Sequence, residues 1–559
     1  MQRTLTALAS TAFDLLVIGG GIYGACVAWD ATLRGLSVAL VDKADFGGET
    51  SANSLKTIHG GLRYLQHADF RRMRESIAER RTLMRIAPHL VHPLPVLLPT
   101  YGHGLQGPEV FAAALFVNDL VSFDRNRLRD PQKHLPRGRV ISKRACLQLL
   151  PELDPHGLTG GALFYDAQVY HSERLTLAFL RSAAQAGAVL ANYVEATGFR
   201  LDGNRITGVA ARDVLCDEHV DIRAQTVVNA SGPWVPHVQE LLNRPASVSP
   251  LRYAKAMNVI TRPLFDHHYA VGIPSRTGYR DADAVVKKGN RLLFAAPWRG
   301  HSIIGTLQAA SCEAAGDVNI TEQDVQGFLD EVNQAYPAAR LQRDDVTFVH
   351  GGHLPLTHID ARTGDVQLAK HERIEDHRQD GIDGLISVTG VKYTTARRVA
   401  ERVVDGVFAM RGQTPARPRS ARTPLYGGQI EQFDRYVRME TAKRAQQLGG
   451  QDIRRLIMNY GTAYANVLKY LGTCPVAAPS VPSEDAVMRA EVRYAVREEM
   501  AQCLSDVIFR RTELGTAGIP GIDVLRACAD VMQAELGWSA TRLEREYQLV
   551  YERQNLARR

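Results

Sequence analysis

The most constraining feature of the chain lies near its start, where residues 14–24 read Asp-Leu-Leu-Val-Ile-Gly-Gly-Gly-Ile-Tyr-Gly. A short apolar run precedes Gly19, Gly21 and Gly24, which have the G-x-G-x-x-G spacing. In this pattern the first glycine allows a tight turn, the second lets backbone N–H groups approach a pyrophosphate, and the third lets a helix pack on a strand. The N-terminus of that helix then faces the phosphate charge. We therefore predict a strand, a turn and a helix that bind a dinucleotide.

Two further segments support the same prediction. A second apolar run, residues 36–41, ends in Asp42, about 20 residues after the glycines, where a carboxylate can accept hydrogen bonds from ribose hydroxyls. Later, residues 226–234 form an apolar run that breaks into small residues at Gly232, where the backbone can pass close to a dinucleotide a second time. Either segment alone would be an ordinary strand end, but together with the glycine turn they point to FAD rather than NAD.

The composition is that of a globular protein with more than one core. The chain has 559 residues, of which 45% are hydrophobic and 23% charged, and this length allows two or three domains. No apolar run reaches the roughly 18 residues of a membrane span, so we expect no transmembrane helix. The seven cysteines lack C-x-x-C and metal-ligand spacing, which favours a reducing compartment and predicts no metal site.

The chain is basic, with a formal net charge of +7. Such a balance fits nucleic acid, an anionic membrane face or an anionic substrate, but no nucleic-acid-binding motif is found and we expect no such partner. Part of the charge falls on a predicted helix, residues 69–88, which carries Met73 and Ile77 on another face. This helix could lie on a membrane surface, or it could be a solvated helix with its apolar stripe in the core; both interpretations stay open. Its arginines are Arg71, Arg72, Arg74, Arg80, Arg81 and Arg85.

The order of the elements predicts an α/β fold with three parts. Residues 13–45 have the strand–helix–strand pattern that opens a doubly wound sheet, and the composition turns mostly helical after residue 411. In residues 484–512, apolar side chains recur at near-helical spacing. We expect a discontinuous Rossmann-like FAD-binding domain, an antiparallel-sheet substrate domain and a helical C-terminal domain. Their expected bounds are 12–95, 170–240 and 380–410 for the first, 96–169 and 241–379 for the second, and 411–559 for the third.

Several motifs carry a resemblance to a known family. They are residues 17–25, 54–65, 228–234, 297–298 with 302–306, 390–395 and 506–512. The most specific are the loop His59-Gly-Gly-Leu-Arg-Tyr64 and the segment Gly390-Val-Lys-Tyr-Thr-Thr395. In these motifs the chain resembles the FAD-dependent glycerol-3-phosphate dehydrogenases, within the D-amino-acid-oxidase-like flavoproteins.

The resemblance implies a reaction and a set of site residues. A secondary alcohol carbon of an anionic polyol phosphate gives hydride to the flavin, and the electrons then pass to a quinone at a membrane or to oxygen. The implied substrate-binding residues are Arg63, Tyr64, Lys392 and Asn258. The implied catalytic residues are His59, Arg63, Lys392 and His353, and the two histidines are candidates for the base that takes the alcohol proton. The implied FAD-binding residues are Gly19, Gly21, Gly24, Asp42, Ser51, Ser54, Val194, Gly232, Gly390 and Thr394.

The substrate half departs from the family's pattern at three places. Leu354 stands where the family has an arginine, Asn258 replaces a histidine, and the family's Gly-Thr-Thr-Asp reads Gly-Thr-Leu-Gln in residues 305–308. Losing one guanidinium from a phosphate site removes a charge-assisted bond of about 1.5–3 kcal/mol. The substrate could therefore be a different hydroxy or amino compound, or the chain could be a flavin-binding protein without catalysis. Retention of Arg63, Tyr64 and Lys392 argues against the second alternative.

The resemblance and the basic charge together predict the partners. We expect a cytoplasmic protein that is peripheral on the inner membrane, with a polyol phosphate as substrate and a quinone as acceptor. The anionic membrane surface is a further expected partner. A homodimer is left open by the sequence.

Overall fold

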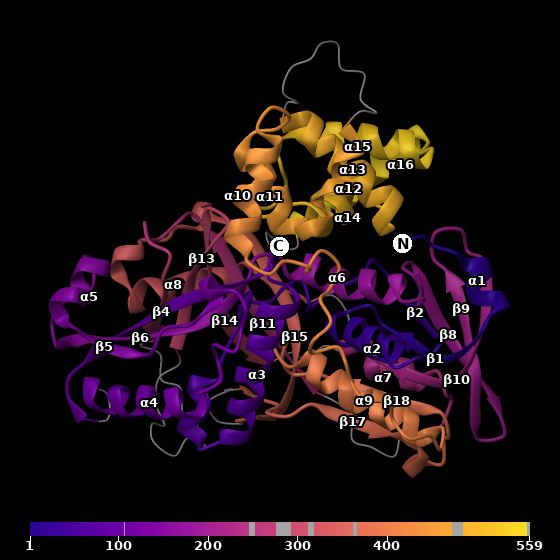
Figure 1. Ribbon diagram of the computed structural model, residues 1–559, viewed down its shortest axis with the longest axis horizontal. Coiled ribbons are helices and arrows are strands. Elements are labelled where there is room, and N and C mark those ends of the chain that lie inside the picture. Colours follow the sequence, from indigo (N-terminus) through magenta and orange to yellow (C-terminus); the bar gives the residue numbers. More distant parts are fainter. Residues whose placement is uncertain are drawn as a thin grey trace.

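Two β-sheets lie side by side and a layer of helices covers one end of both, as Figure 1 shows. The computed structural model describes residues 1–104, 107–244, 252–275, 292–310, 318–360, 366–471 and 484–555. The predicted fold class is confirmed: a Rossmann-like α/β part, an antiparallel-sheet part and a helical C-terminal part are all present. Among the described residues, no helix is both long and apolar enough to cross a bilayer.

The first sheet has a parallel centre, as expected for a dinucleotide-binding fold. Its strands follow the order β17–β18–β10–β1–β2–β7, and β8 and β9 form a meander that pairs with β10. β1 pairs in parallel with both β10 and β2, which brings the carboxyl ends of these three strands to one edge. The bounds are β1 Ala12–Ile18, β2 Val38–Val41, β7 Val189–Ala191, β8 Val194–Asp202, β9 Arg205–Asp213, β10 His219–Asn229, β17 Arg373–Asp376 and β18 Leu385–Thr389.

Three helices cover one face of this sheet because their apolar residues are buried against it. They are α2, Ile22–Leu33, α6, Ser172–Gln185, and α9, Ala396–Met410. The other face packs against the short helix α1, Leu5–Ser10, and the β8–β9–β10 meander. The glycine turn lies between β1 and α2, so the folded chain places it at the carboxyl edge of the sheet.

The second sheet is mostly antiparallel and carries the substrate-side motifs. Its order is β16–β15–β11–β14–β13–β12–β4–β6–β3, with β5 paired to β6. Helices α4, Pro108–Val121, α5, Lys143–Leu149, and α8, Glu322–Ala335, accompany it. The bounds are β3 Thr57–Ile58, β4 Val91–Tyr101, β5 Arg139–Ser142, β6 Leu158–Val169, β11 Arg252–Thr261, β12 Ala270–Pro274, β13 Leu292–Trp298, β14 His301–Ala310, β15 Val346–Ile359 and β16 Val366–Leu368.

The C-terminal part is helical and forms the orange and yellow layer of Figure 1. The predicted stripe in residues 484–512 does not form one helix, because α13 ends at Glu499 and Met500 has a φ of +57°. A short π-helical turn, Val507–Arg511, follows instead. The helices are α10 Phe433–Arg444, α11 Gly450–Tyr460, α12 Tyr464–Leu468, α13 Glu484–Glu499, α14 Leu504–Asp506, α15 Ile522–Leu536 and α16 Ala540–Asn555.

The basic helix predicted at 69–88 is α3, Phe70–Ile86. Its apolar stripe is buried, since Met73 and Ile77 are both 0% exposed. Most of its arginines are engaged inside the protein: Arg74 and Arg81 both bind the Asp124 carboxylate, Arg80 binds Asp166, and Arg72 is buried. Of the two interpretations, packing in the core describes this helix.

Candidate cofactor and substrate site

The turn between β1 and α2 can be made only with glycines at two of its positions. Gly19 has a φ of +104°, and a Cβ there would lie 2.7 Å from the carbonyl oxygen of Ala230. A Cβ at Gly24 would lie 1.9 Å from the Gly19 carbonyl oxygen. Gly21 precedes the first turn of α2, so the N–H groups at that helix end face outward from the sheet edge. The turn therefore has the shape and the donors that a pyrophosphate needs.

Asp42 follows β2 and braces the glycine turn. One carboxylate oxygen accepts the N–H of Gly20 at 2.6 Å, and the other accepts the N–H of Ala44 at 2.9 Å. Its backbone carbonyl accepts the N–H of Val194 at 2.7 Å. Burial raises the pKa of Asp42 to about 6. Because each carboxylate oxygen can accept a second hydrogen bond, the predicted role toward ribose hydroxyls is compatible with this arrangement.

Residues 50–53 join three elements that are distant in sequence. The Ser51 hydroxyl oxygen accepts the N–H of Ile22, the first residue of α2, at 3.0 Å. The Thr50 hydroxyl donates to the carbonyl of His353 on β15 at 3.3 Å. The Asn53 carbonyl accepts from the amide of Asn258 on β11 at 3.2 Å. This segment therefore connects the dinucleotide turn with both substrate-side strands.

The segment that follows β18 closes over the start of α2. The Tyr23 hydroxyl donates to the carbonyl of Lys392 at 2.8 Å and accepts from its backbone N–H at 3.3 Å. A Cβ at Gly390 would lie 1.9 Å from the Tyr23 ring, so the close approach requires glycine. Thr394 is buried two residues before α9 begins. Gly232 has a φ of +61° and open space where a Cβ would stand.

The remaining FAD-binding candidate, Ser54, lies in the same loop as Ser51. Its hydroxyl accepts the N–H of Lys56 at 3.3 Å. The glycine turn, Asp42 and the loop from Ser51 to Ser54 thus gather at one sheet edge, together with Gly390. Such a cradle of glycine backbone and helix N–H groups fits FAD, and these residues would hold its pyrophosphate and ribose.

Cations gather around the ring of Tyr64, in a group that we call the Tyr64 cluster (His59, Tyr64, Arg72 and Lys392). The ammonium of Lys392 lies 4.4 Å and the guanidinium of Arg72 4.5 Å from the Tyr64 ring centre. The His59 ring meets that of Tyr64 edge to face at 5.8 Å. Burial and the charge of Arg72 lower the pKa of Lys392 to about 8. The cluster therefore offers positive charge to an anion, but burial and the neighbouring Arg72 make the charged form of Lys392 less stable.

The residues of the segment 59–64 differ in exposure. Burial, followed by the positive charges of Lys392 and Arg80, lowers the pKa of His59 to about 3, so its imidazole is neutral at pH 7. Burial raises the pKa of Tyr64 to about 12. Arg63, in contrast, is exposed on the short 3₁₀ helix Leu62–His67. The loop thus presents one exposed cation beside a partly buried group.

The substrate-side strands hold the three departures from the family pattern. Asn258 is buried, and its amide oxygen accepts the hydroxyl of Thr306 at 2.9 Å while its NH₂ donates to Asn53. His353 is buried on β15, with its ring 6.2 Å from that of Tyr253. Leu354 is the next residue and is partly buried. These residues lie on strands of the second sheet. The Tyr64 cluster comes from the segment after β3 of the same sheet, from α3, and from the segment after β18 of the first sheet.

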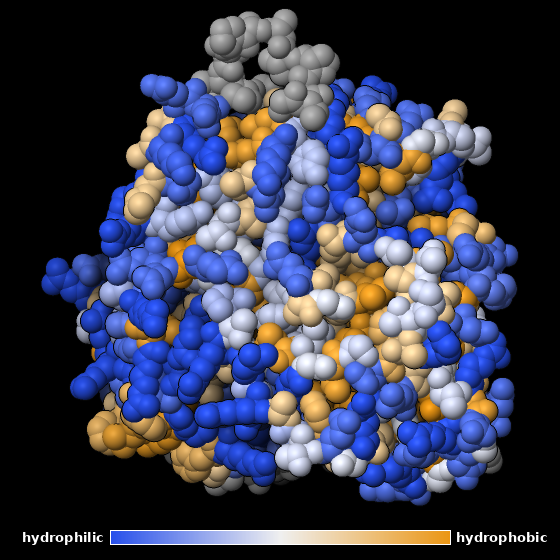
Figure 2. Space-filling view, turned by 45° about the vertical axis from the view of Figure 1, so that its right-hand side comes forward, coloured by the Kyte–Doolittle hydropathy of each residue, from blue (hydrophilic) through white to orange (hydrophobic). Residues whose placement is uncertain are grey.

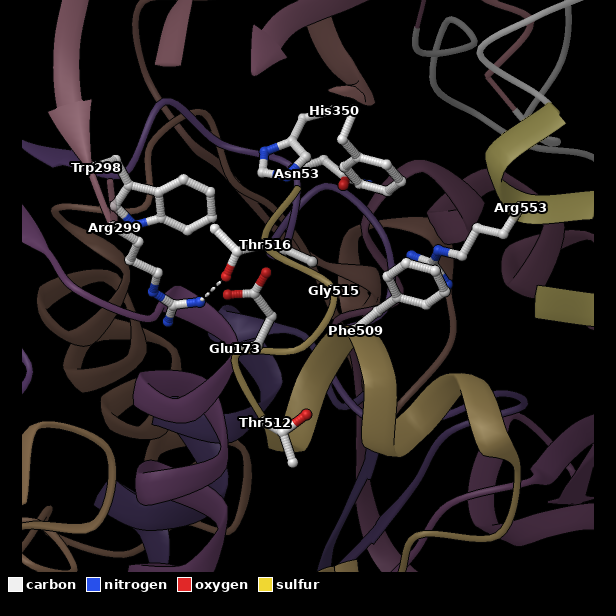
Figure 3. Close-up of a pocket in the computed structure, with 12 residues that line it drawn as sticks. Asn53, Glu173, Trp298, Arg299, His350, Phe509, Thr512, Gly515, Thr516 and Arg553 are labelled. Carbon is white, nitrogen blue, oxygen red and sulfur yellow. Dashed lines mark hydrogen bonds between the residues drawn. The ribbon is translucent and has the colours of Figure 1, made fainter. Parts of the chain in front are cut away.

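A small cavity lies where the three parts meet, and the sequence did not indicate it. Figure 3 shows Trp298 and Arg299 on one side of it and Phe509 and Arg553 on the other, with His350 next to Asn53, and Arg299 donates to the hydroxyl of Thr516. The C-terminal residues are Phe509, Thr512, Gly515, Thr516 and Arg553. Trp298, Phe509 and Thr512 belong to motifs that we singled out, but no local pattern indicated that they meet, because the lining residues are up to about 500 positions apart in the sequence. Among the described residues, no set of acidic, histidine or cysteine side chains could hold a metal ion.

Two family models match the chain. The model described as FAD dependent oxidoreductase matches residues 14–404, and the model described as the C-terminal domain of alpha-glycerophosphate oxidase matches residues 418–543. Together they account for both sheets and most of the helical layer. FAD is therefore the cofactor of this chain, as predicted.

Relatives and solved structures agree over nearly the full length. A glycerol-3-phosphate dehydrogenase of Synechocystis is 33% identical over 99% of this chain and 98% of its own length. The mitochondrial glycerol-3-phosphate dehydrogenase of mouse is 31% identical over 97% of this chain and 73% of its own. The crystal structure of the Bacillus halodurans glycerol-3-phosphate dehydrogenase complexed with FAD is 27% identical and covers 99% of this chain and 96% of its own, with a TM-score of 0.78. The chain belongs to the FAD-dependent glycerol-3-phosphate dehydrogenase family of FAD-dependent oxidoreductases.

Proposed function

We propose that the protein oxidises sn-glycerol 3-phosphate to dihydroxyacetone phosphate and passes the electrons to a quinone at a membrane surface. The observation that carries this proposal is the Tyr64 cluster, which brings two cations within 4.5 Å of one ring beside His59. A phosphate dianion requires fixed positive charge, and ammonium and guanidinium groups supply it. Membership of the family supports the same substrate.

The cofactor and the side chains of the site have separate roles in the proposed reaction. Bound FAD supplies the acceptor for the hydride that leaves the secondary alcohol carbon. Lys392 and the exposed Arg63 bind the phosphate and fix its distance from the cradle at Gly390. His59 is neutral at pH 7, so one ring nitrogen is free of a proton and can take the alcohol proton.

Substrate binding also makes His59 a better base. Burial and the positive charges of Lys392 and Arg80 disfavour its protonated form. A phosphate dianion beside Lys392 offsets part of this charge and raises the pKa of His59 toward its ordinary value. His353 is the second candidate for the base, and it lies on β15 one residue before Leu354.

A second candidate function is oxidation of a related hydroxy or amino compound. Leu354 favours it, because an apolar side chain at this position offers no charge to a phosphate. The amide of Asn258 is already engaged at both ends, which fixes its orientation in the site. A substrate with less negative charge would need fewer cations.

The reaction is tested by incubating the holoenzyme with sn-glycerol 3-phosphate and a short-chain quinone without oxygen. We expect one dihydroxyacetone phosphate and one quinol for each substrate consumed. Product that forms only with oxygen, with peroxide in equal amount, would contradict the quinone as acceptor. No product with either acceptor would favour the second candidate.

The membrane surface is proposed to contact α4 rather than α3. Helix α4 buries only one side chain, Leu115, although it is rich in apolar residues. Phe116 and Leu120, four residues apart on α4, are 65% and 59% exposed, and Phe123, in the turn just after the helix, is 68% exposed. Figure 2 shows apolar side chains gathered at the lower left edge of a mostly hydrophilic surface, the end where Figure 1 places α4. An exposed apolar patch of this kind marks a partner or a lipid surface.

Charge beside the patch favours lipid as the partner. The guanidinium of Arg127 lies 5.7 Å from the Phe123 ring centre, and that of Arg74, which is paired with Asp124, lies 5.1 Å from it. We expect the triple variant F116S/L120S/F123S to lose sedimentation with phosphatidylglycerol vesicles while keeping its activity with a soluble acceptor. M439S/I522S, which changes exposed apolar residues of the C-terminal part, is the control. Unchanged sedimentation of the triple variant would contradict the proposal.

A further inference from the structure

One loop lies over the dinucleotide turn and is held from behind by the C-terminal helices. We call residues 45–53 the cover loop. Its Phe46 ring packs on the glycine turn so closely that a Cβ at Gly20 would lie 2.4 Å from it. Its Ser51 accepts the N–H of Ile22, which is one of the donors at the start of α2. The position of this loop therefore affects both the shape of the turn and the N–H of Ile22 at the start of α2, which donates to Ser51.

The first anchor of the cover loop is the buried carboxylate of Asp45. Both its oxygens accept from the guanidinium of Arg511 at 2.7 Å, and Arg510 donates to one of them as well. The side chains of Asp45 and Arg511 are each 1% exposed. The positive charges of the two arginines lower the pKa of Asp45 and keep it ionised. Both arginines belong to the π-helical turn of the C-terminal part.

The second anchor is Arg553, in the last turn of α16. Its guanidinium donates to the carbonyl oxygen of Gly48 at 3.1 Å and lies 5.2 Å from the Phe509 ring. Figure 3 shows Arg553 reaching from α16 past Phe509 into the cavity that Asn53 also lines. Burial and the nearby Arg510 lower the pKa of Arg553 to about 10, so it is charged at pH 7.

The two anchors suit a role beyond joining the domains. The C-terminal part is docked elsewhere by Arg174, which pairs with the buried Glu499 at 2.6 Å. The Arg553 bond, in contrast, ends on the backbone of the cover loop, between Phe46 and Ser51. A bond at this place supports the loop between its two contacts with the dinucleotide turn.

We propose that the C-terminal helical domain is a clamp on FAD, in which Arg553 is a positioning residue that holds the cover loop on the glycine turn. FAD then leaves only when the cover loop lifts, and lifting breaks the Arg553–Gly48 bond. The domain thus sets how tightly the cofactor is held. This proposal rests on FAD binding alone and does not depend on the identity of the substrate.

The test compares the Arg553→Met and Arg553→Lys variants with Arg545→Met, an exposed arginine on the same helix. FAD affinity is measured by titrating the apoprotein and following flavin fluorescence. For R553M we expect the dissociation constant of FAD to rise roughly tenfold, the size typical for a hydrogen bond to a charged group. R553K, which keeps one donor and the charge, should recover part of the loss, and R545M should bind like the wild type.

Two readouts separate a clamp from a merely structural contact. The melting temperature of the apoprotein should be the same for R553M and R545M, because the bond acts on cofactor retention. Combined with Ser51→Ala, R553M should cost less than the sum of the two single losses, since both act through the cover loop. An unchanged FAD dissociation constant in R553M overturns the proposal, and so does strict additivity with S51A. A lower apoprotein melting temperature with normal FAD affinity would show that Arg553 only docks α16.

Discussion

The glycine turn and the Tyr64 cluster hold their shapes by opposite means. In the turn, a single added carbon at Gly24 would lie 1.9 Å from the Gly19 carbonyl, so the backbone itself excludes other residues. In the cluster, side chains from two distant segments meet through charge and ring contacts at 4.4–5.8 Å. We therefore expect a substitution in the glycine turn to abolish FAD binding, whereas a single substitution in the Tyr64 cluster should only weaken substrate binding.

The largest effect is expected from Gly24→Val. The new side chain must displace the Gly19 carbonyl, which destroys the pyrophosphate turn, and overpacking of this kind costs about 1–3 kcal/mol of unfolding free energy. We expect purified G24V to carry almost no flavin, as measured by the ratio of absorbance at the flavin band to that at 280 nm. Gly327→Ala on α8 is the matched control, because open space surrounds it. Normal flavin content in G24V would contradict the steric requirement for glycine at position 24.

Lys392→Met should lower kcat/KM for sn-glycerol 3-phosphate while the flavin spectrum stays normal. Loss of one charge-assisted hydrogen bond costs about 1.5–3 kcal/mol, which corresponds to roughly a 10- to 150-fold decrease. Lys143→Met is the control, since the Lys143 ammonium bonds only the exposed Pro155 carbonyl among the contacts described. An unchanged kcat/KM in K392M would contradict the assignment of the Tyr64 cluster to the substrate site.

The pH dependence of kcat/KM tests the role of the Lys392 charge. Lys392 has a pKa of about 8, so it is charged below pH 8 and loses its proton as the pH rises through this value. Affinity for a phosphate dianion should therefore fall above pH 8, by about tenfold in kcat/KM over the next pH unit or two. In Lys392→Arg the fall near pH 8 should disappear, because guanidinium stays charged. A pH profile identical in wild type and K392R would contradict this role.

The smallest effect is expected from Leu354→Arg, which restores the charge that the family pattern has at this position. If the substrate is sn-glycerol 3-phosphate, kcat/KM should rise by up to about tenfold, because one more cation faces the phosphate. The KM for the phosphate substrate is the quantity to compare, with Leu368→Arg on the neighbouring β16 as a control for added charge. No gain in L354R would favour the second candidate substrate class.

Local sequence was sufficient for the parts of the fold that repeat a short pattern. The strand–helix–strand unit at 13–45 corresponds to β1, α2 and β2, and the helix predicted at 69–88 is α3 at Phe70–Ile86. Steric rules for glycine determine the first, and apolar spacing determines the second. A dinucleotide cofactor was likewise predictable, because the turn and Asp42 lie within one βαβ unit, and the later segment with Gly232 pointed to FAD rather than NAD.

Contacts between distant segments were not predictable from such patterns. The arginines of α3 looked available to a membrane, but Asp124 and Asp166, which bind them, lie on other elements. The bond between Arg553 and Gly48 joins residues 505 positions apart. The helical spacing of apolar residues also continues past the end of α13, so it did not indicate the break at Met500, which takes a left-handed backbone conformation. Each of these depends on tertiary packing, which overrides local preference.

The most direct test of the account is the visible spectrum of the holoenzyme before and after anaerobic addition of sn-glycerol 3-phosphate. We expect the flavin band to bleach in the wild type, and to bleach only at much higher substrate concentration in K392M. A flavin band that persists in the wild type at saturating substrate would contradict hydride transfer from this compound. The FAD assignment would then stand, and the substrate would have to be another hydroxy or amino compound.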